Sequence, residues 1–153
     1  MHVGRFPLVV ILALLTMAAS GPLRADGAAL YAVHCAACHQ PDGNGAEGLA
    51  PPLAGVLEKR ARVAGGREYL AQVVVSGMVG SIKSRGVKYI GNMPSAAALS
   101  DDELSAVMGY VLSNFNASPL QMPSALFAGA RSKGLQPTAV RLQRERILAE
   151  VGE

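Results

Sequence analysis

The sequence has no tryptophan, only four tyrosines and three phenylalanines, and only 16% charged residues. A small chain so poor in large side chains has difficulty filling a core alone, and such chains commonly depend on a disulfide, a metal or a bound prosthetic group. Hydrophobic residues make up 50% of the 153 positions, which excludes a disordered or collagen-like chain. This composition predicts one modest globular domain with appendages.

Excess positive charge is also scarce. The formal net charge is +3, and two of the basic residues, Arg5 and Arg24, lie in the first 25 residues. Without that stretch the chain is close to neutral. This excludes the basic stripe that nucleic-acid binding requires.

The N-terminal apolar run is too short to span a membrane. It covers 12 residues, Leu8 to Ala19, whereas a membrane-spanning helix needs ~20 apolar residues. A basic start precedes the run, and small residues and a turn follow it at Ser20-Gly21-Pro22. The pattern predicts a cleavable secretory signal peptide over residues 1–25, cut after Ala25 or alternatively after Ser20, and hence an exported protein.

Cysteine is rare, and both cysteines fall in one pentapeptide, Cys35-Ala36-Ala37-Cys38-His39. This is the C-x-x-C-H signature of covalent haem attachment. On a helical turn the positions i, i+3 and i+4 share one face, so both thiols can reach the two vinyl groups of a porphyrin while the imidazole of His39 points at the iron. The motif predicts one covalently attached haem c.

Three other interpretations of the pentapeptide stay open: a chance occurrence, a disulfide and a zinc site. A structural or thioredoxin-like disulfide would use Cys35 and Cys38, but it leaves His39 without a role and the βαβ context is absent. A zinc site would need a fourth ligand. The other histidine after the signal peptide, His34, adjoins Cys35 on the wrong side of the loop.

A haem iron bound by His39 has a sixth coordination position, for which the methionines after residue 25 are candidates. Met93 precedes a proline in a stretch rich in loop residues, which can bring a thioether close to a porphyrin. Met78 and Met108 lie in or near helix-like runs, where methionine ordinarily fills a core. Met122 also precedes a proline and is the competitor of Met93, although it lies beyond the helix that closes the expected domain.

Apolar spacing and turn residues predict an all-α fold. Helices are expected over residues 26–37, 67–76 and 101–115, with a short helical turn over residues 53–59. The run Val73-Val74-Val75 could equally form a strand, but no second strand of comparable strength is expected to pair with it. Ser100 and Glu103 predict a capping box.

Residues 118–153 form a C-terminal extension with a helix expected to begin at Pro137. Its apolar residues, Val140, Ile147 and Leu148, either dock a partner or pack on the chain's own domain.

Residues 26–116 resemble a class I c-type cytochrome, a small helical domain around one haem with His and Met axial ligands. The resemblance implies that Gly27 and Tyr31 pack against Tyr110, that the carbonyl of Pro51 accepts a hydrogen bond from the axial histidine, and that Leu53 lies against the haem. The implied domains are a signal peptide (1–25), a cytochrome c domain (26–117) and a helical extension (118–153). The implied cofactor-binding residues are Cys35, Cys38, His39, Pro51, Leu53 and Met93, with His39 and Met93 on the iron.

The segment from Tyr69 to Leu104 is similar to single-haem cytochrome subunits and domains that accompany periplasmic dehydrogenases. This implies a periplasmic electron carrier, not an enzyme, between such a dehydrogenase and a downstream cytochrome or oxidase. Neither nucleic-acid binding nor a stable membrane span after cleavage is expected. Two alternatives stay open: a haem enzyme or gas-binding sensor with an open sixth position, and a permanent cytochrome subunit of a dehydrogenase complex.

Overall fold

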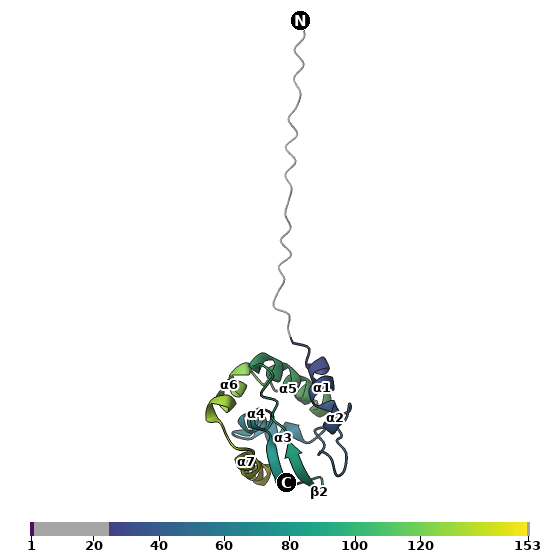
Figure 1. Cartoon of the computed structure of the whole chain (residues 1–153), viewed down its shortest axis with the longest axis vertical. Helices are drawn as coiled ribbons and strands as arrows, with labels where there is room; N and C mark the ends of the chain where they lie inside the picture. The colour runs from purple at the N-terminus through teal and green to yellow at the C-terminus, as the bar shows by residue number, and fades with distance from the viewer. Residues whose placement is uncertain (2–24, 153) are drawn as a thin grey trace.

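Helices and one β-hairpin make up the part of the chain that the computed structural model describes, Met1 and residues 25–152 (Figure 1). The predicted signal peptide falls almost wholly outside these residues and stays a prediction. The elements are α1 (Gly27–His34), α2 (Ala36–His39), α3 (Leu57–Arg62), α4 (Gly66–Ser76), β1 (Met78–Ser84), β2 (Val87–Met93), α5 (Asp101–Asn116), α6 (Ser124–Lys133) and α7 (Pro137–Val151). No helix among residues 25–152 has the length and apolar character that crossing a bilayer needs.

Helices α1 and α5 begin at residues with side-chain caps, and α4 ends at a glycine. The Asp26 carboxylate accepts hydrogen bonds from the first backbone N–H groups of α1. The predicted capping box of α5 is present, with Ser100 Oγ accepting from the Glu103 N–H and the Glu103 carboxylate accepting from the Ser100 N–H. Gly77, in the left-handed region at φ 75°, ends α4. The helical interpretation of residues 73–75 is therefore confirmed.

The short helix expected over residues 53–59 lies later, at α3. The N–H groups of Leu53 and Ala54 both donate to the carbonyl oxygen of Gly43, which holds these two residues in the loop before α3. The N–H of Leu57 donates to Asn116 Oδ1 at 2.8 Å, which fixes the first turn of α3 against the end of α5.

The prediction of a purely α-helical fold is wrong in one respect. Strands β1 and β2 form a two-stranded antiparallel sheet, with Met78 opposite Met93 and Ser84 opposite Val87. The connecting residues Arg85 and Gly86 both have positive φ, 48° and 80°, which matches the right-handed twist of paired strands as a type I′ turn does. Residues 78–84 and 87–93 thus supply each other's partner strand, and residues 73–75 are not part of the sheet.

The C-terminal extension packs on the rest of the chain. Helix α6, which was not predicted, contacts α4 and α5, and α7 contacts α3, α4 and β1. Figure 1 shows α6 and α7 on one side of the molecule and α1 and α2 on the other. Phe127 and Val140 have no exposed surface, and Ile147 is 4% exposed. Of the two interpretations of the extension, packing on its own chain is the one that the structure has, and Val140 and Ile147 are not available to a partner.

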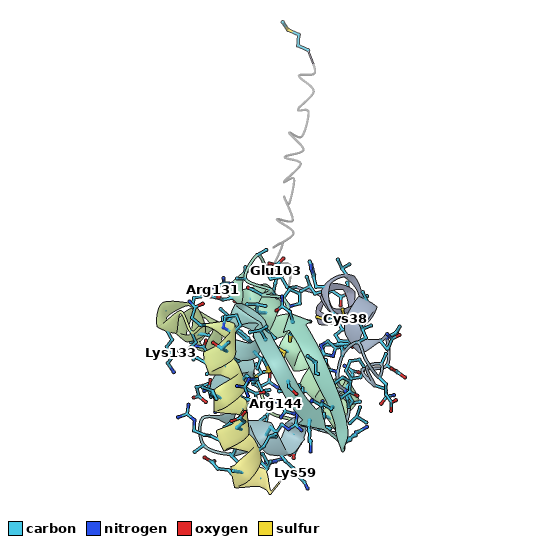
Figure 2. All side chains as sticks on the ribbon, turned by 60° about the horizontal axis from the view of Figure 1, so that its bottom comes forward. Cys38, Lys59, Glu103, Arg131, Lys133 and Arg144 are labelled. Atoms are coloured by element: carbon cyan, nitrogen blue, oxygen red, sulfur yellow. The ribbon has the colours of Figure 1, made fainter. Side chains whose placement is uncertain are left out.

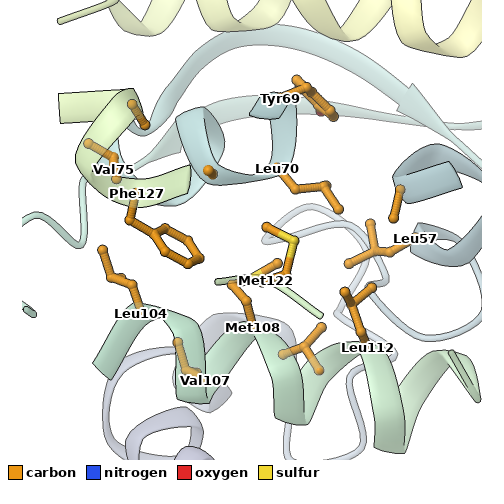
Figure 3. Close-up of a cluster of buried hydrophobic side chains, with 14 of the residues drawn as sticks. Leu57, Tyr69, Leu70, Val75, Leu104, Val107, Met108, Leu112, Met122 and Phe127 are labelled. Carbon is orange, nitrogen blue, oxygen red and sulfur yellow. The ribbon is translucent and has the colours of Figure 1, made fainter. Parts of the chain in front are cut away.

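The hydrophobic core lies between α3, α4, α5 and the extension (Figure 3). Met122 is 1% exposed and sits at the centre of this cluster. Leu57, Leu70, Met108 and Leu112 surround it in Figure 3. Met122 and Met108 therefore fill the core, as long flexible side chains commonly do.

The contact between α1 and α5 depends on Gly27. A Cβ atom added there would lie 2.2 Å from the carbonyl oxygen of Ala106. We expect Gly27→Ala to push the two helices apart and to lower the free energy of unfolding by about 1–3 kcal/mol, the usual cost of overpacking. Chemical unfolding followed by circular dichroism measures the change.

Gly109→Ala is the matched control for this substitution. No atom lies within 4 Å of a Cβ at Gly109, which is inside α5, so alanine there is expected to be neutral or to stabilise by ~0.5–1 kcal/mol. Equal destabilisation by the two substitutions would contradict a specific close approach at Gly27.

Candidate functional site

The residues of the C-x-x-C-H motif lie on one helical turn, as predicted. The carbonyl oxygen of Cys35 accepts hydrogen bonds from the N–H groups of Cys38 at 3.2 Å and His39 at 2.9 Å. Both cysteines are free thiols. Cys35 is half-buried, and Cys38, which Figure 2 labels, is exposed. Burial, and less strongly the neighbouring Cys38, raise the pKa of the Cys35 thiol. Two thiol side chains and one imidazole side chain therefore lie on a single helical turn.

The His39 imidazole is buried and oriented by the backbone. Its Nδ1 lies 2.9 Å from the carbonyl oxygen of Pro51. A carbonyl only accepts, so Nδ1 carries the proton and Nε2 keeps its lone pair. Burial lowers the pKa of His39, and the bond to Pro51 opposes this in part. A neutral imidazole with a fixed tautomer is what a metal ligand requires.

The loop from Gln40 to Val56 is held against α5, which fixes Pro51 and Leu53 relative to His39. Leu53 N–H donates to the carbonyl oxygen of Gly43 at 2.7 Å. Gly43 has φ 72°, and a Cβ there would lie 2.7 Å from the ring of Phe115. Leu53 is half-buried and packs against the core.

An aromatic cluster anchors the start of this loop. The expected contact between Tyr31 and Tyr110 is present, with ring centroids 5.7 Å apart. Phe115, which sequence reasoning missed, completes the cluster at 5.0 Å from Tyr31 and 5.3 Å from Tyr110. The Tyr31 hydroxyl donates to the carbonyl oxygen of Gln40 at 2.7 Å. Burial raises the pKa of Tyr31 to about 12, so this donor keeps its proton at any physiological pH.

The methionine candidates differ in burial. Met78, Met108 and Met122 are buried, whereas Met93 is half-buried at the edge of the core. Residues 89–93, expected as loop, belong to β2, and the loop begins at Pro94. At the other end of the hairpin, Arg85 Nη2 donates to the carbonyl oxygen of Ala54 at 2.6 Å. The hairpin therefore runs from Met93 to the loop that carries Pro51 and Leu53.

Comparison with known proteins places this site in a family. The family model described as cytochrome c matches residues 24–115, more than half of the chain. The chain belongs to the cytochrome c family. It is 36% identical over 140 residues to a cytochrome c-552 of Thermus thermophilus, covering 92% of this chain and 93% of that relative. A second cytochrome c-552, also from Thermus thermophilus, is 39% identical over 127 residues, which is 83% of this chain and 95% of the relative.

Family membership gives the chain one covalently attached haem c and the role of an electron-carrying cytochrome with redox partner proteins. Cys35 and Cys38 fit the attachment motif. Within residues 25–152 no three His, Cys, Asp or Glu side chains are grouped to hold a metal ion, so a zinc site has no donor set there. A haem c needs two thiols for its thioether bonds and an imidazole for its iron, and this turn carries two free thiols and a neutral buried imidazole.

The likeness to the first of these relatives extends into the C-terminal extension. Since 92% of the chain is aligned, most of residues 118–153 lie within the match, whereas the family model ends at residue 115. Most of the extension is thus matched by this relative.

Proposed function

We propose that this cytochrome is a periplasmic single-haem electron carrier with His39 and Met93 as its axial iron ligands. The observation that supports this most is the hydrogen bond from His39 Nδ1 to the Pro51 carbonyl, because it leaves Nε2 for iron. Among the methionines of residues 25–152, Met93 is the one that is not buried, and it lies on a hairpin tied to the His39 loop through Arg85 and Ala54.

The haem supplies a one-electron ferric/ferrous couple, and the chain's residues set its potential and position. Cys35 and Cys38 attach the macrocycle, Pro51 holds the imidazole of His39, and Leu53 supplies apolar contact. A thioether ligand such as Met93 favours the reduced state. Low-dielectric surroundings disfavour the extra positive charge of ferric iron. The thioether ligand and the low-dielectric surroundings therefore both raise the reduction potential.

Electrons are exchanged at the surface around the attachment turn and Met93. Cys38 is exposed, and exposed apolar side chains lie on either side of it in the sequence, Val33 at 73% and Leu49 at 57%. Ile90, 72% exposed, lies on β2 near Met93. Single exposed apolar side chains of this kind suit small, transient contacts with a partner protein. The proposed donor is a periplasmic dehydrogenase and the proposed acceptor a downstream cytochrome or oxidase.

The proposed chain organisation has a cleaved signal peptide over residues 1–25, a cytochrome c domain over 26–117 and an extension over 118–153. Export places the thiols where haem attachment to C-x-x-C-H occurs. The extension packs on α4 and β1.

Met93→Ala tests the ligand assignment. We expect the ferric protein to lose its weak near-infrared sulfur-to-iron absorption, the reduction potential to fall, and small ligands to bind the iron, because the thioether is gone. Near-infrared spectra and an equilibrium redox titration measure these changes.

Met122→Ala is the matched control, since it also removes one methionine that precedes a proline. It is expected to keep the near-infrared band but to lower the free energy of unfolding by about 2–5 kcal/mol, because it leaves a cavity in the core. Loss of the band in Met122→Ala and its retention in Met93→Ala would reverse the assignment.

A further inference from the structure

An irregular segment, residues 94–100 (the 94–100 segment), joins β2 to α5 and begins directly after the proposed thioether ligand. It contains no helix or strand, yet its backbone is attached to the end of α4. The N–H of Ala96 donates to the carbonyl oxygen of Val74 at 2.8 Å. Ser95 Oγ donates to the carbonyl oxygen of Val75 at 2.6 Å. The start of the segment therefore has a fixed position on α4.

The rest of the 94–100 segment is bound by Arg131, a residue of the C-terminal extension. Arg131 Nη1 donates to the carbonyl oxygen of Ala97 at 2.8 Å, and Nη2 donates to that of Leu99. Arg131 Nε donates to the Asp101 carboxylate at 2.7 Å, at the first residue of α5. One guanidinium group therefore binds two carbonyl groups of the segment and the start of the helix that follows it.

The backbone of Met93 is in close contact with the same end of α4. A Cβ atom added at Gly77 would lie 2.4 Å from the carbonyl oxygen of Met93 and 3.0 Å from the nitrogen of Ser95. Met93 is also paired with Met78 in the sheet. The backbone that carries the thioether is thus fixed by the sheet before it, by α4 beside it and by Arg131 after it.

Helix α6 is itself attached to α4, so the core sets the position of Arg131. Gln72 Nε2, on α4, donates to the carbonyl oxygen of Ala130 at 3.1 Å, and both residues are buried. The side chain of Arg131 is 33% exposed and that of Asp101 is 29% exposed, so their contact is partly shielded from water. Hydrogen bonds from a charged donor are about twice as strong as those between neutral groups. Arg131 therefore connects the extension firmly to the 94–100 segment.

A thioether is a soft ligand, and ferric iron is the harder of the two oxidation states, so the ferric form depends most on how firmly the chain presents the sulfur. We propose that Arg131 is a positioning residue for Met93: by binding the 94–100 segment, it keeps the thioether where it can bind the iron. This inference rests on the proposed function. It gives the extension a role in setting the reduction potential, in addition to filling the core.

The experiment compares Arg131→Gln with Lys133→Gln in the full-length holoprotein. Lys133→Gln is the matched control, because it removes one positive charge from an exposed position of the same helix. Figure 2 shows Lys133 at the outer edge of α6. Removing an outer-shell contact typically weakens ligand binding by about 10–100-fold. We expect Arg131→Gln to weaken the ferric near-infrared band, lower the reduction potential and speed carbon monoxide binding to ferrous iron by about that factor. Lys133→Gln is expected to leave all three unchanged.

Arg131→Lys separates geometry from charge, because lysine keeps the positive charge but lacks the rigid fork of donors. It is expected to weaken the near-infrared band as Arg131→Gln does. A band and a potential fully restored by lysine would show that charge alone acts, and would overturn the inference.

Gly77→Ala tests the α4 side of the same contact without changing a charge. Gly65→Ala is its control, because Gly65 lies at the other end of α4 with a similar positive φ, 72° against 75°, and no atom lies within 4 Å of a Cβ there. Both substitutions are expected to lower the melting temperature, since alanine is strained at these angles. Only Gly77→Ala is expected to weaken the near-infrared band. An intact band in Gly77→Ala would show that the Met93 backbone need not be held, which contradicts the inference.

The melting temperature distinguishes positioning from stability alone. If Arg131→Gln lowers the melting temperature but keeps the wild-type band, potential and carbon monoxide rate, Arg131 only stabilises the fold and the inference is overturned. A wild-type protein without the near-infrared band, or a Met93→Ala variant that retains it, would instead refute Met93 as the ligand. Failure of this inference and failure of the proposed function are therefore distinguishable.

Discussion

Replacing both Cys35 and Cys38 with alanine abolishes covalent haem attachment. These are the only thiols in the sequence, and the thioether bonds have no other source in the chain. Each single substitution leaves one thioether and is expected to weaken haem retention without eliminating it. Denaturing electrophoresis with haem staining and the intact mass measure the outcome in a host that has haem-attachment machinery.

The same double substitution is expected to lower the melting temperature, because a chain with so few aromatic side chains depends on the haem to fill its interior. Wild-type protein from the same host is the control, and its band must stain. A stained band from the double variant would contradict attachment through Cys35 and Cys38.

Ending the chain after Asn116 destroys the stable fold. The removed side chains include Met122, Phe127, Val140 and Ile147, each at most 4% exposed. Losing one buried side chain of this size costs about 2–5 kcal/mol, and a domain has only about 5–15 kcal/mol in total. Thermal unfolding followed by circular dichroism, together with the yield of haem-loaded protein, measures the loss.

Two single substitutions on α7 test the same packing more mildly. Val140→Ala is expected to lower the melting temperature, because Val140 has no exposed surface, whereas Leu142→Ala is the control, since Leu142 is 52% exposed. A truncated protein with the wild-type melting temperature and haem spectrum would show that the extension is dispensable for folding and available to a partner.

Much of the fold follows from local sequence. The spacing of apolar residues predicts α4 and α5, the Ser100 and Glu103 capping box predicts where α5 begins, and Pro137 predicts the start of α7. The hairpin was missed because its signal is a two-residue turn, Arg85-Gly86, whose arginine is uncommon at positive φ. Helix α6 was missed because it has no side-chain cap and is stabilised by tertiary contacts such as the 3.1 Å bond from Gln72 Nε2 to the Ala130 carbonyl.

The candidate site likewise has one part that local sequence predicts and another part that it does not. Cys35, Cys38 and His39 are contiguous, so their spacing alone predicts a shared helical turn. The hydrogen bond between His39 and the Pro51 carbonyl was predicted only through resemblance to a family. A contact across a glycine-rich loop leaves no periodic pattern in the sequence.

Carbon monoxide binding to the reduced wild-type holoprotein tests the central claim most directly. A ferrous iron held by both His39 and Met93 has no free coordination position, so the visible spectrum is expected to stay unchanged when carbon monoxide is added. An open sixth position, as in a haem enzyme or gas-binding sensor, would give a carbon monoxide-bound spectrum at once. That spectrum in the wild-type protein would contradict the assignment of a six-coordinate electron carrier.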